Sequence, residues 1–144
     1  MTLRVSKAQW EALRRHGEEA YPAECCGVLV GSIDANGCKQ VTSAIRCRNT
    51  REDSPTNRYE IDPRELLRIQ RESRNTGSEI VGFYHSHPDH PPRWSRTDLA
   101  EAHWTGCSFV ITSVEHGRAG ETASFILNGD EETKSFLAEE IEIL

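Results

Sequence analysis

The chain has 144 residues, a formal net charge of −6 at pH 7 and a pI near 5.5. A protein with this excess of negative charge does not attract a phosphate backbone, so we expect no nucleic-acid partner. The length favours one domain over residues 1–144, large enough to hold a core without disulfides or a structural metal.

The chain begins with MTLRVSKAQW, which lacks an apolar signal core, and no segment has the apolar length needed to cross a bilayer. We therefore expect a cytoplasmic protein with no membrane partner. The five cysteines are odd in number and form no CxxC pair, which indicates reduced thiols that pack as small hydrophobic side chains.

The first half of the chain predicts a helix followed by a β-hairpin. Ser6 and Gln9 form a capping-box pattern ahead of a helix over residues 7–20. Two apolar segments, 26–33 and 39–47, flank the turn sequence DANG, and this arrangement is typical of a hairpin.

A polar stretch and a second helix follow the hairpin. Residues 49–58 contain a proline and lack periodicity, so we expect a mobile loop, followed by a short extended piece at 59–61. Asp62 as the N-cap and Pro63 at the first helical position indicate a helix that ends near Gly77.

The second half of the chain predicts three strands and two helices. Segment 79–85 is a short buried strand, 95–104 a third helix, and 107–114 pairs with 122–127 across a glycine-containing loop. Residues 130–144 are predicted to form an acidic amphipathic helix. The expected fold class is α+β, with a mixed or antiparallel sheet flanked by helices.

Chemically active side chains gather in the segment GFYHSHPDHPPRWSRTD, residues 82–98. If the preceding strand continues through His87, then His85 and His87 point to the same face of the sheet. The prolines end regular structure, and Ser95 caps a new helix whose third residue is Asp98. Two imidazoles and one carboxylate match the three-ligand pattern of catalytic zinc sites. Taken alone, however, the serine and the aspartate are an ordinary helix start.

A hydrolytic zinc site also needs a base, and the candidate is Glu24 in PAECCGVLVG. Glu24 lies between the first helix and an apolar strand, and we expect this strand beside the one that carries His85 and His87. A glutamate at such a corner is ordinarily a solvated surface residue.

The remaining candidates are weaker. His90 is interpreted as an exposed loop histidine, and His16, His103 and His116 as structural or solvated residues. Cys25 follows the candidate base directly. A catalytic thiol, however, requires a histidine that is free to activate it, and the paired histidines are assigned to metal.

Together these residues resemble the JAMM motif of the JAB/MPN/Mov34/PAD-1 metallopeptidases in their compact prokaryotic form. The glutamate lies in a PxExCGxLxG context, followed by HxHP and the downstream serine and aspartate. The resemblance implies the MPN fold and one Zn²⁺ bound by His85, His87 and Asp98. It also implies Glu24 as general acid and base, and Ser95 as a residue that stabilises the oxyanion.

The same resemblance implies a substrate class. Relatives act on conjugates of ubiquitin-like or sulfur-carrier proteins, so we expect hydrolysis of an amide or isopeptide bond after a C-terminal glycine. The reaction releases either a lysine-linked protein or an amino acid such as cysteine. A slim glycine tail pairing with the chain near residues 49–60 suits a recessed metal. The loop 49–58 and the turn 88–94 are expected to form the walls of the site.

Several alternatives stay open. A non-catalytic MPN-type interaction module and a zinc peptidase of broader specificity both fit the same motif, and a structural metal site needs a fourth protein ligand. A zinc nucleobase deaminase is disfavoured because the chain has HxH rather than HxE, and no CxxC. The sequence does not indicate an oligomeric state.

Overall fold

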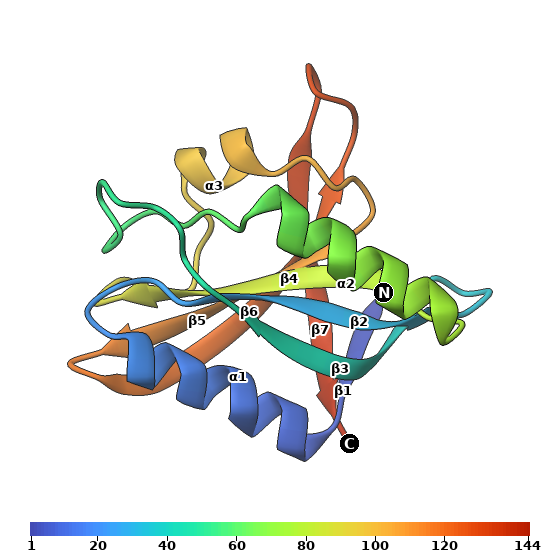
Figure 1. Cartoon of the computed structure of the whole chain (residues 1–144), viewed down its shortest axis with the longest axis horizontal. Helices are drawn as coiled ribbons and strands as arrows, with labels where there is room; N and C mark the ends of the chain where they lie inside the picture. Colours follow the sequence, from blue (N-terminus) through green and yellow to red (C-terminus); the bar gives the residue numbers. More distant parts are fainter.

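The computed structural model describes all residues, 1–144, and its strands form a closed barrel with three helices around it (Figure 1). The order of strands around the barrel is β1-β3-β2-β4-β5-β6-β7. The elements are β1 (Thr2–Val5), α1 (Lys7–Ala20), β2 (Cys26–Ile33), β3 (Lys39–Cys47), α2 (Pro63–Asn75), β4 (Glu79–Pro88), α3 (Arg96–Glu101), β5 (Ser108–Glu115), β6 (Arg118–Asn128) and β7 (Ser135–Ile143).

The sheet is mixed and carries a separate apolar cluster on each face. β1 pairs in parallel with both β3 and β7 and so closes the barrel, while β4 and β5 form another parallel pair. Along β2, Val28 belongs to the cluster that contains Ile69 of α2, and Leu29 to the cluster that contains Leu13 of α1. Because successive strand residues point to opposite faces, α1 and α2 cover opposite sides of the sheet (Figure 1).

The first helix, the hairpin, the second helix and the α+β class are confirmed. Both halves of the Ser6 and Gln9 capping box are present. Gly27 in the hairpin is required by a close approach, since a Cβ atom there would lie 2.0 Å from the ring of Tyr84 on β4. The Tyr84 ring of β4 therefore packs directly over the backbone of Gly27 on β2.

Three expectations were wrong or incomplete. The third helix ends at Glu101 rather than at residue 104, because Ala102 turns to an extended backbone with φ −83° and ψ 125°. The N-terminal residues before the first helix form a strand, β1. The predicted C-terminal helix is instead β7, which pairs antiparallel with β6 and parallel with β1.

The C-terminal segment forms a strand because it pairs with β6 and β1 and because its buried Glu139 has polar partners in that position. Glu139 has an exposed fraction of only 8%, and its Oε2 lies 3.4 Å from Nζ of the equally buried Lys39 on β3. Its Oε1 accepts hydrogen bonds of 2.7 Å from the hydroxyls of Ser108 and Ser124. Tertiary contacts of this kind override a local helix propensity.

The segment between β3 and α2 has no regular secondary structure, as expected for residues 49–58. Its ends are held together by a hydrogen bond of 2.9 Å from the amide of Thr50 to the carbonyl oxygen of Glu60.

None of the three helices combines the length and the apolar character that a bilayer-crossing helix requires.

The Lys39 and Glu139 pair gives a test of the barrel closure. We expect Lys39→Met to lower the free energy of unfolding by about 3–5 kcal/mol, because it leaves a buried carboxylate without its cation. The double variant Lys39→Met with Glu139→Leu should recover much of that loss, since it removes both charges. Urea unfolding measures both. Equal stability of the single variant and the wild type would contradict the buried pair.

Candidate metal centre

Strand β4 presents the two histidines to one face of the sheet. It runs on to Pro88, and His85 and His87 are buried, with exposed fractions of 2% and 7%. The strand lies between β2 and β5, where His85 is paired with Cys26 on one side and with Ile111 on the other. Backbone pairing, on both sides for His85 and with Ser113 of β5 for His87, therefore fixes the direction of both imidazoles.

The short helix α3 brings Asp98 to the histidines. Ser95 is its N-cap, and its hydroxyl oxygen accepts a hydrogen bond of 3.0 Å from the amide of Asp98. In return, the amide of Ser95 donates a 2.8 Å hydrogen bond to Oδ2 of Asp98. The capping box thus aims the carboxylate, and the helix-start and ligand interpretations of these two residues are compatible.

The three side chains converge on one point. The candidate ligand atoms of His85, His87 and Asp98 all lie within 4.8 Å of one another, and Nε2 of His85 is 3.2 Å from Nε2 of His87. Asp98 approaches both rings, with Oδ1 3.4 Å from His85 Nε2 and Oδ2 3.1 Å from His87 Nε2. Nδ1 of His87 lies 3.0 Å from the carbonyl oxygen of Pro91, so it carries the proton and leaves Nε2 free as a ligand.

The imidazole ring of His85 is held in a different way from that of His87. Nδ1 of His85 is buried and has no hydrogen-bond partner within the protein. Instead, the ring of Tyr59 stacks on the His85 imidazole with a centroid distance of 4.6 Å and an interplanar angle of 27°. His85 is therefore oriented by strand pairing and stacking rather than by the polar partner that usually orients a metal-binding histidine.

The electrostatics of the cluster suit a cation. Burial alone would raise the pKa of Asp98, but hydrogen bonds with His85, His87 and the Ser95 amide hold that pKa well below its usual range. Burial lowers the pKa of His85 and so favours the neutral imidazole. An ionised carboxylate and a neutral imidazole are the forms that a metal ion binds. The donor set of two nitrogens and one oxygen therefore fits a zinc ion with one open position.

Glu24 lies beside this cluster at the start of β2. Its exposed fraction is 3%, and its Oε1 has no hydrogen-bond partner within the protein. Burial raises the pKa of Glu24 to about 8, with Asp98 and Glu101 adding to the effect and His87 opposing it. The carboxyl group is thus able to hold or release a proton near neutral pH. It lines a cavity of about 320 Å³ together with Asn57, His87, His90, Pro91, Arg93, Trp94 and Ser95.

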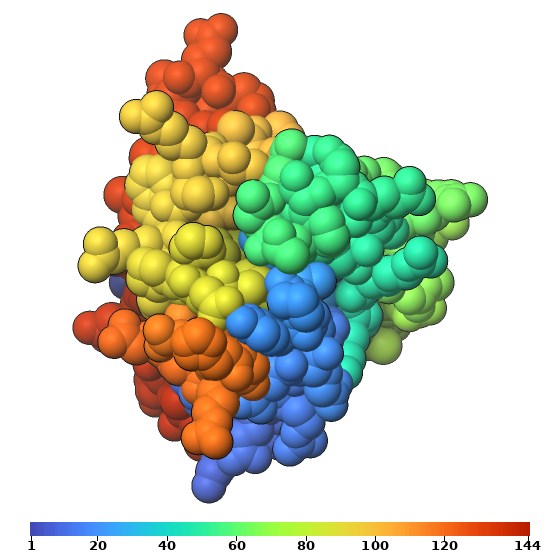
Figure 2. Space-filling view, turned by 90° about the vertical axis from the view of Figure 1, so that its left-hand side faces the viewer, coloured from blue at the N-terminus to red at the C-terminus, as the bar shows by residue number.

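The backbone around Glu24 is held by the loop that follows β3. The amide of Glu24 donates a 2.8 Å hydrogen bond to the carbonyl oxygen of Pro55, and Asn49 Nδ2 donates to the carbonyl oxygen of Glu24 over 3.2 Å. Figure 2 shows this green loop bordering the yellow segment that follows β4 and the blue start of β2. Both expected walls, 49–58 and 88–94, thus contribute residues to the cavity.

Two supporting residues were missed by the sequence interpretation. Asn49 and Tyr59 lie in a segment without periodicity, so only the folded chain reveals that one holds the Glu24 backbone and the other stacks on a histidine.

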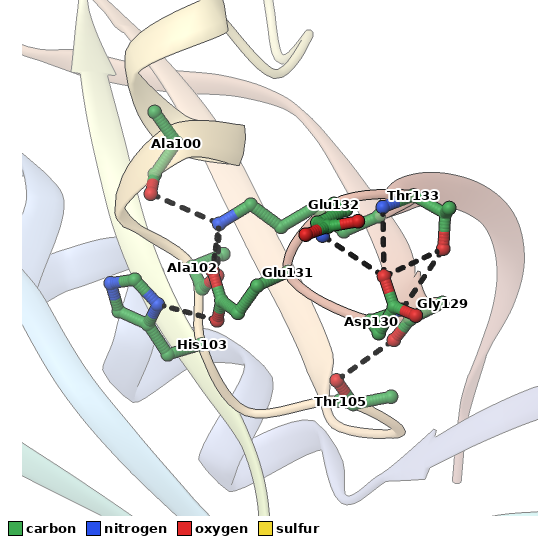
Figure 3. A network of polar contacts seen from close by, with 10 residues as sticks. Ala100, Ala102, His103, Thr105, Gly129, Asp130, Glu131, Glu132 and Thr133 are labelled. Carbon is green, nitrogen blue, oxygen red and sulfur yellow. Dashed lines mark hydrogen bonds and ion pairs between the residues drawn. The ribbon is translucent and has the colours of Figure 1, made fainter.

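A polar network outside the cavity anchors the far end of α3. This short helix contains no fully buried residue, and it packs on the core through the half-buried Leu99 and the buried Ala102 that ends it. Lys134, in the turn between β6 and β7, donates hydrogen bonds of 3.0 and 2.9 Å to the carbonyl oxygens of Ala100 and Ala102. Figure 3 shows Glu131 of the same turn meeting His103 just beyond the helix, where the two side chains are 2.8 Å apart. We infer that the turn steadies the helix that carries Asp98.

The cluster generates a prediction on metal affinity. We expect His85→Ala, His87→Ala and Asp98→Ala each to weaken binding of Zn²⁺ strongly, because each removes one of three donor atoms. The matched control is His90→Ala, an exposed histidine of the same cavity that lies outside the cluster. Calorimetric titration of the metal-free proteins gives the affinities, and unchanged binding in the three ligand variants would exclude this cluster as the metal centre.

The anchoring network generates a second prediction. Lys134→Met should weaken Zn²⁺ binding about tenfold, the lower end of the effect of losing a group that orients a ligand. Lys134→Arg should restore most of the affinity because it keeps donors for the two carbonyl oxygens. Lys7→Met, at an exposed lysine on α1, is the control. If Lys134→Met lowers thermal stability and leaves the affinity unchanged, the turn does not position Asp98.

Comparison with known proteins agrees with this geometry. A family model described as prokaryotic homologs of the JAB domain matches residues 6–127. The chain is 39% identical over 110 residues to a desampylase of Haloferax volcanii, covering 76% of this chain and 73% of that protein. It is 29% identical over 119 residues to a probable TtuB-protein conjugate cleaving protease of Thermus thermophilus, covering 83% and 75%.

Solved structures show the same fold. A protein of Desulfitobacterium hafniense matches with a TM-score of 0.84 and 30% identity, covering 100% of this chain and 93% of that one. A JAB1/MPN domain protein of Archaeoglobus fulgidus matches in fold alone, with a TM-score of 0.58 and 16% identity over 100% of this chain and 96% of that one. The chain belongs to the prokaryotic JAB family and is a compact member of the JAMM/MPN proteins.

Proposed function

We propose that the protein is a zinc metallopeptidase that hydrolyses an amide or isopeptide bond after the C-terminal glycine of a ubiquitin-like or sulfur-carrier protein. The proposal treats residues 1–144 as one JAMM/MPN domain that works in the cytoplasm. The observation that carries it is the cluster of His85, His87 and Asp98 beside a buried glutamate with a free carboxyl oxygen. The names of the Haloferax and Thermus relatives support the substrate class.

The three residues of the cluster would hold the metal ion and leave one position for water or substrate. When bound, zinc lowers the pKa of water toward about 7 and polarises a carbonyl group. The protein's part is to supply two imidazoles and an ionised carboxylate from a backbone held by β-pairing and a helix cap.

Glu24 is proposed as the residue that moves the proton. Its unpaired Oε1 accepts a proton from the attacking water and later delivers it to the leaving amine. The pKa of about 8 in the metal-free protein makes this carboxyl group a good proton donor, and a nearby cation favours its ionised form, which is the base. No residue of the protein needs to bond covalently to the substrate.

Ser95 is proposed as a donor to the oxygen that becomes negative when water attacks the carbonyl. The hydroxyl oxygen of Ser95 already accepts a hydrogen bond from the amide of Asp98, so the hydroxyl hydrogen of Ser95 is free to donate one. The residue is exposed and lines the same cavity as Glu24 and His87. One hydroxyl group therefore caps the ligand-bearing helix and also faces the reacting carbonyl.

A tail ending in glycine suits the recessed position of the site. Glu24 and the histidines are almost fully buried, and the loop 49–58 and the turn 88–94 both contribute residues to the cavity. Only a chain without side chains reaches the buried cluster between such walls. A carrier tail is therefore favoured over a general polypeptide.

The deciding experiment uses the zinc-loaded protein and small ubiquitin-like proteins ending in Gly-Gly, each joined either to a lysine peptide by an isopeptide bond or to a single amino acid by a peptide bond. We expect cleavage that a chelator abolishes, measured by mass spectrometry. Glu24→Gln should keep its zinc and lose turnover by about 10²- to 10⁴-fold, because it loses the proton acceptor. Glu11→Gln, at an exposed glutamate on α1, is the control.

Each other outcome points elsewhere. Wild-type turnover in Glu24→Gln would show that another group is the base. Full zinc binding without cleavage of any adduct would favour the non-catalytic interaction module.

The tail itself gives a further prediction. Replacing the carrier's last glycine by leucine should abolish cleavage while the zinc content of the enzyme stays unchanged, because a branched side chain does not fit beside the buried histidines. Initial rates on the two carriers measure the effect. Equal rates, or equally fast cleavage of unfolded casein, would instead support a peptidase of broader specificity.

A further inference from the structure

The cavity that holds Glu24 has one permanently charged cation in its wall, Arg93. The cavity measures about 320 Å³ and also includes the metal-ligand candidate His87 and the exposed Ser95. Arg93 lies in the segment between β4 and α3, which has no regular secondary structure. An arginine that lines the same cavity as the proposed proton-transfer residue has no role in the hydrolysis described so far.

Arg93 differs from Arg51 and Arg58 of the loop 49–58 in having no carboxylate partner. Arg51 is engaged with Asp53, 3.0 Å away, and Arg58 forms an ion pair with Glu101. Arg93 forms no ion pair, so its five N–H donors remain available to a ligand. A planar guanidinium recognises carboxylate oxygens with two parallel hydrogen bonds.

The backbone of Arg93 is fixed relative to the metal cluster. The carbonyl oxygen of Pro91 accepts a 2.8 Å hydrogen bond from the amide of Arg93 and also the 3.0 Å contact from Nδ1 of His87. On the other side, Trp94 packs on Phe136 with a centroid distance of 5.5 Å. The backbone of Arg93 is therefore held in place on both sides by these contacts.

A second cavity next to the first limits where a negative charge is tolerated. It measures about 400 Å³ and shares His90 and Pro91 with the cavity of Glu24. Its walls carry Asp89, Glu115 and Glu121 and no lysine or arginine. A carboxylate positioned beyond Arg93 would meet like charges, so the favourable place for it is close to the reacting bond.

We propose that Arg93 binds the α-carboxylate of a single amino acid that leaves the carrier's C-terminal glycine. This inference rests on the proposed function and names its leaving group. Water adds to the glycine carbonyl carbon, the C–N bond breaks, and one proton passes to the leaving amine, so the products are the carrier with a free glycine carboxylate and a free amino acid. In a lysine side-chain adduct, by contrast, four methylene groups separate the scissile bond from the α-carbon of the lysine.

The test is a cycle of two substrates and two enzymes. The probes are a peptide ending in Gly-Gly-Ala with a free carboxylate and the same peptide with a C-terminal carboxamide. We expect the wild-type zinc-loaded protein to prefer the acid by about 10- to 100-fold in kcat/KM, the range for a charged hydrogen bond. Arg93→Gln should reduce this preference to near unity. Arg93→Lys should keep part of it, because lysine supplies the charge without the fork.

The matched control is Arg96→Gln, at an exposed arginine three positions further on that forms no ion pair and does not line the cavity. It should keep the full preference for the acid. The same two peptides titrated calorimetrically into the zinc-loaded Glu24→Gln variant, with and without Arg93→Gln, give a readout independent of turnover.

Equal affinity for acid and carboxamide, or a preference that survives Arg93→Gln, would overturn the assignment. An isopeptide adduct of Gly-Gly on lysine that is cut as fast as the acid would also overturn it, and the hydrolase function would stand. If neither peptide nor isopeptide is cut but the Arg93-dependent difference in affinity is present, the carboxylate site stands and the proposed hydrolysis fails.

Discussion

The register in which β4 pairs with β2 governs the whole candidate site. Cys26 lies opposite His85, so the residue two positions before Cys26 arrives beside the histidines. A shift by one residue would turn both imidazoles into the opposite face of the sheet. Gly27 secures this register from within, because the Tyr84 ring occupies the space that a side chain at that position would need. Two segments distant in sequence thus meet through backbone hydrogen bonds.

The groups around this rigid centre are held in a different way. α3 has no fully buried residue and packs on the core through the half-buried Leu99, and the loop after β3 has no regular structure, so polar contacts help to hold both. Asn49 holds the backbone of Glu24, and Lys134 holds the end of α3. Such segments open at a lower free energy than core strands. The third ligand therefore lies on a segment that is better able to adjust to a substrate than the strand that carries the histidines.

Burial of polar groups serves two separate purposes in this barrel. Glu139 is satisfied by Lys39 and two serine hydroxyls, and these contacts tie β7 to β3, β5 and β6. Glu24 is equally hidden but keeps an unpaired oxygen, and its burial raises its pKa to about 8. An unsatisfied buried acid lowers stability, and such a cost is typical of a site that awaits a ligand.

The sequence by itself determined the class of fold, the capping boxes and the hairpin, because these follow from local patterns of cap, turn and strand alternation. It predicted the five residues of the candidate site mainly through their resemblance to the JAMM motif. Only the tertiary structure decided that residues 135–143 form a strand, that Tyr59 stacks on His85 and that Lys134 reaches α3. The acidic C-terminal segment has the composition of a helix, and its glutamate becomes acceptable in a barrel only when a lysine 100 positions away lies opposite it. Local patterns report what a segment prefers when alone, whereas partners that are far apart in sequence become neighbours only when the barrel closes.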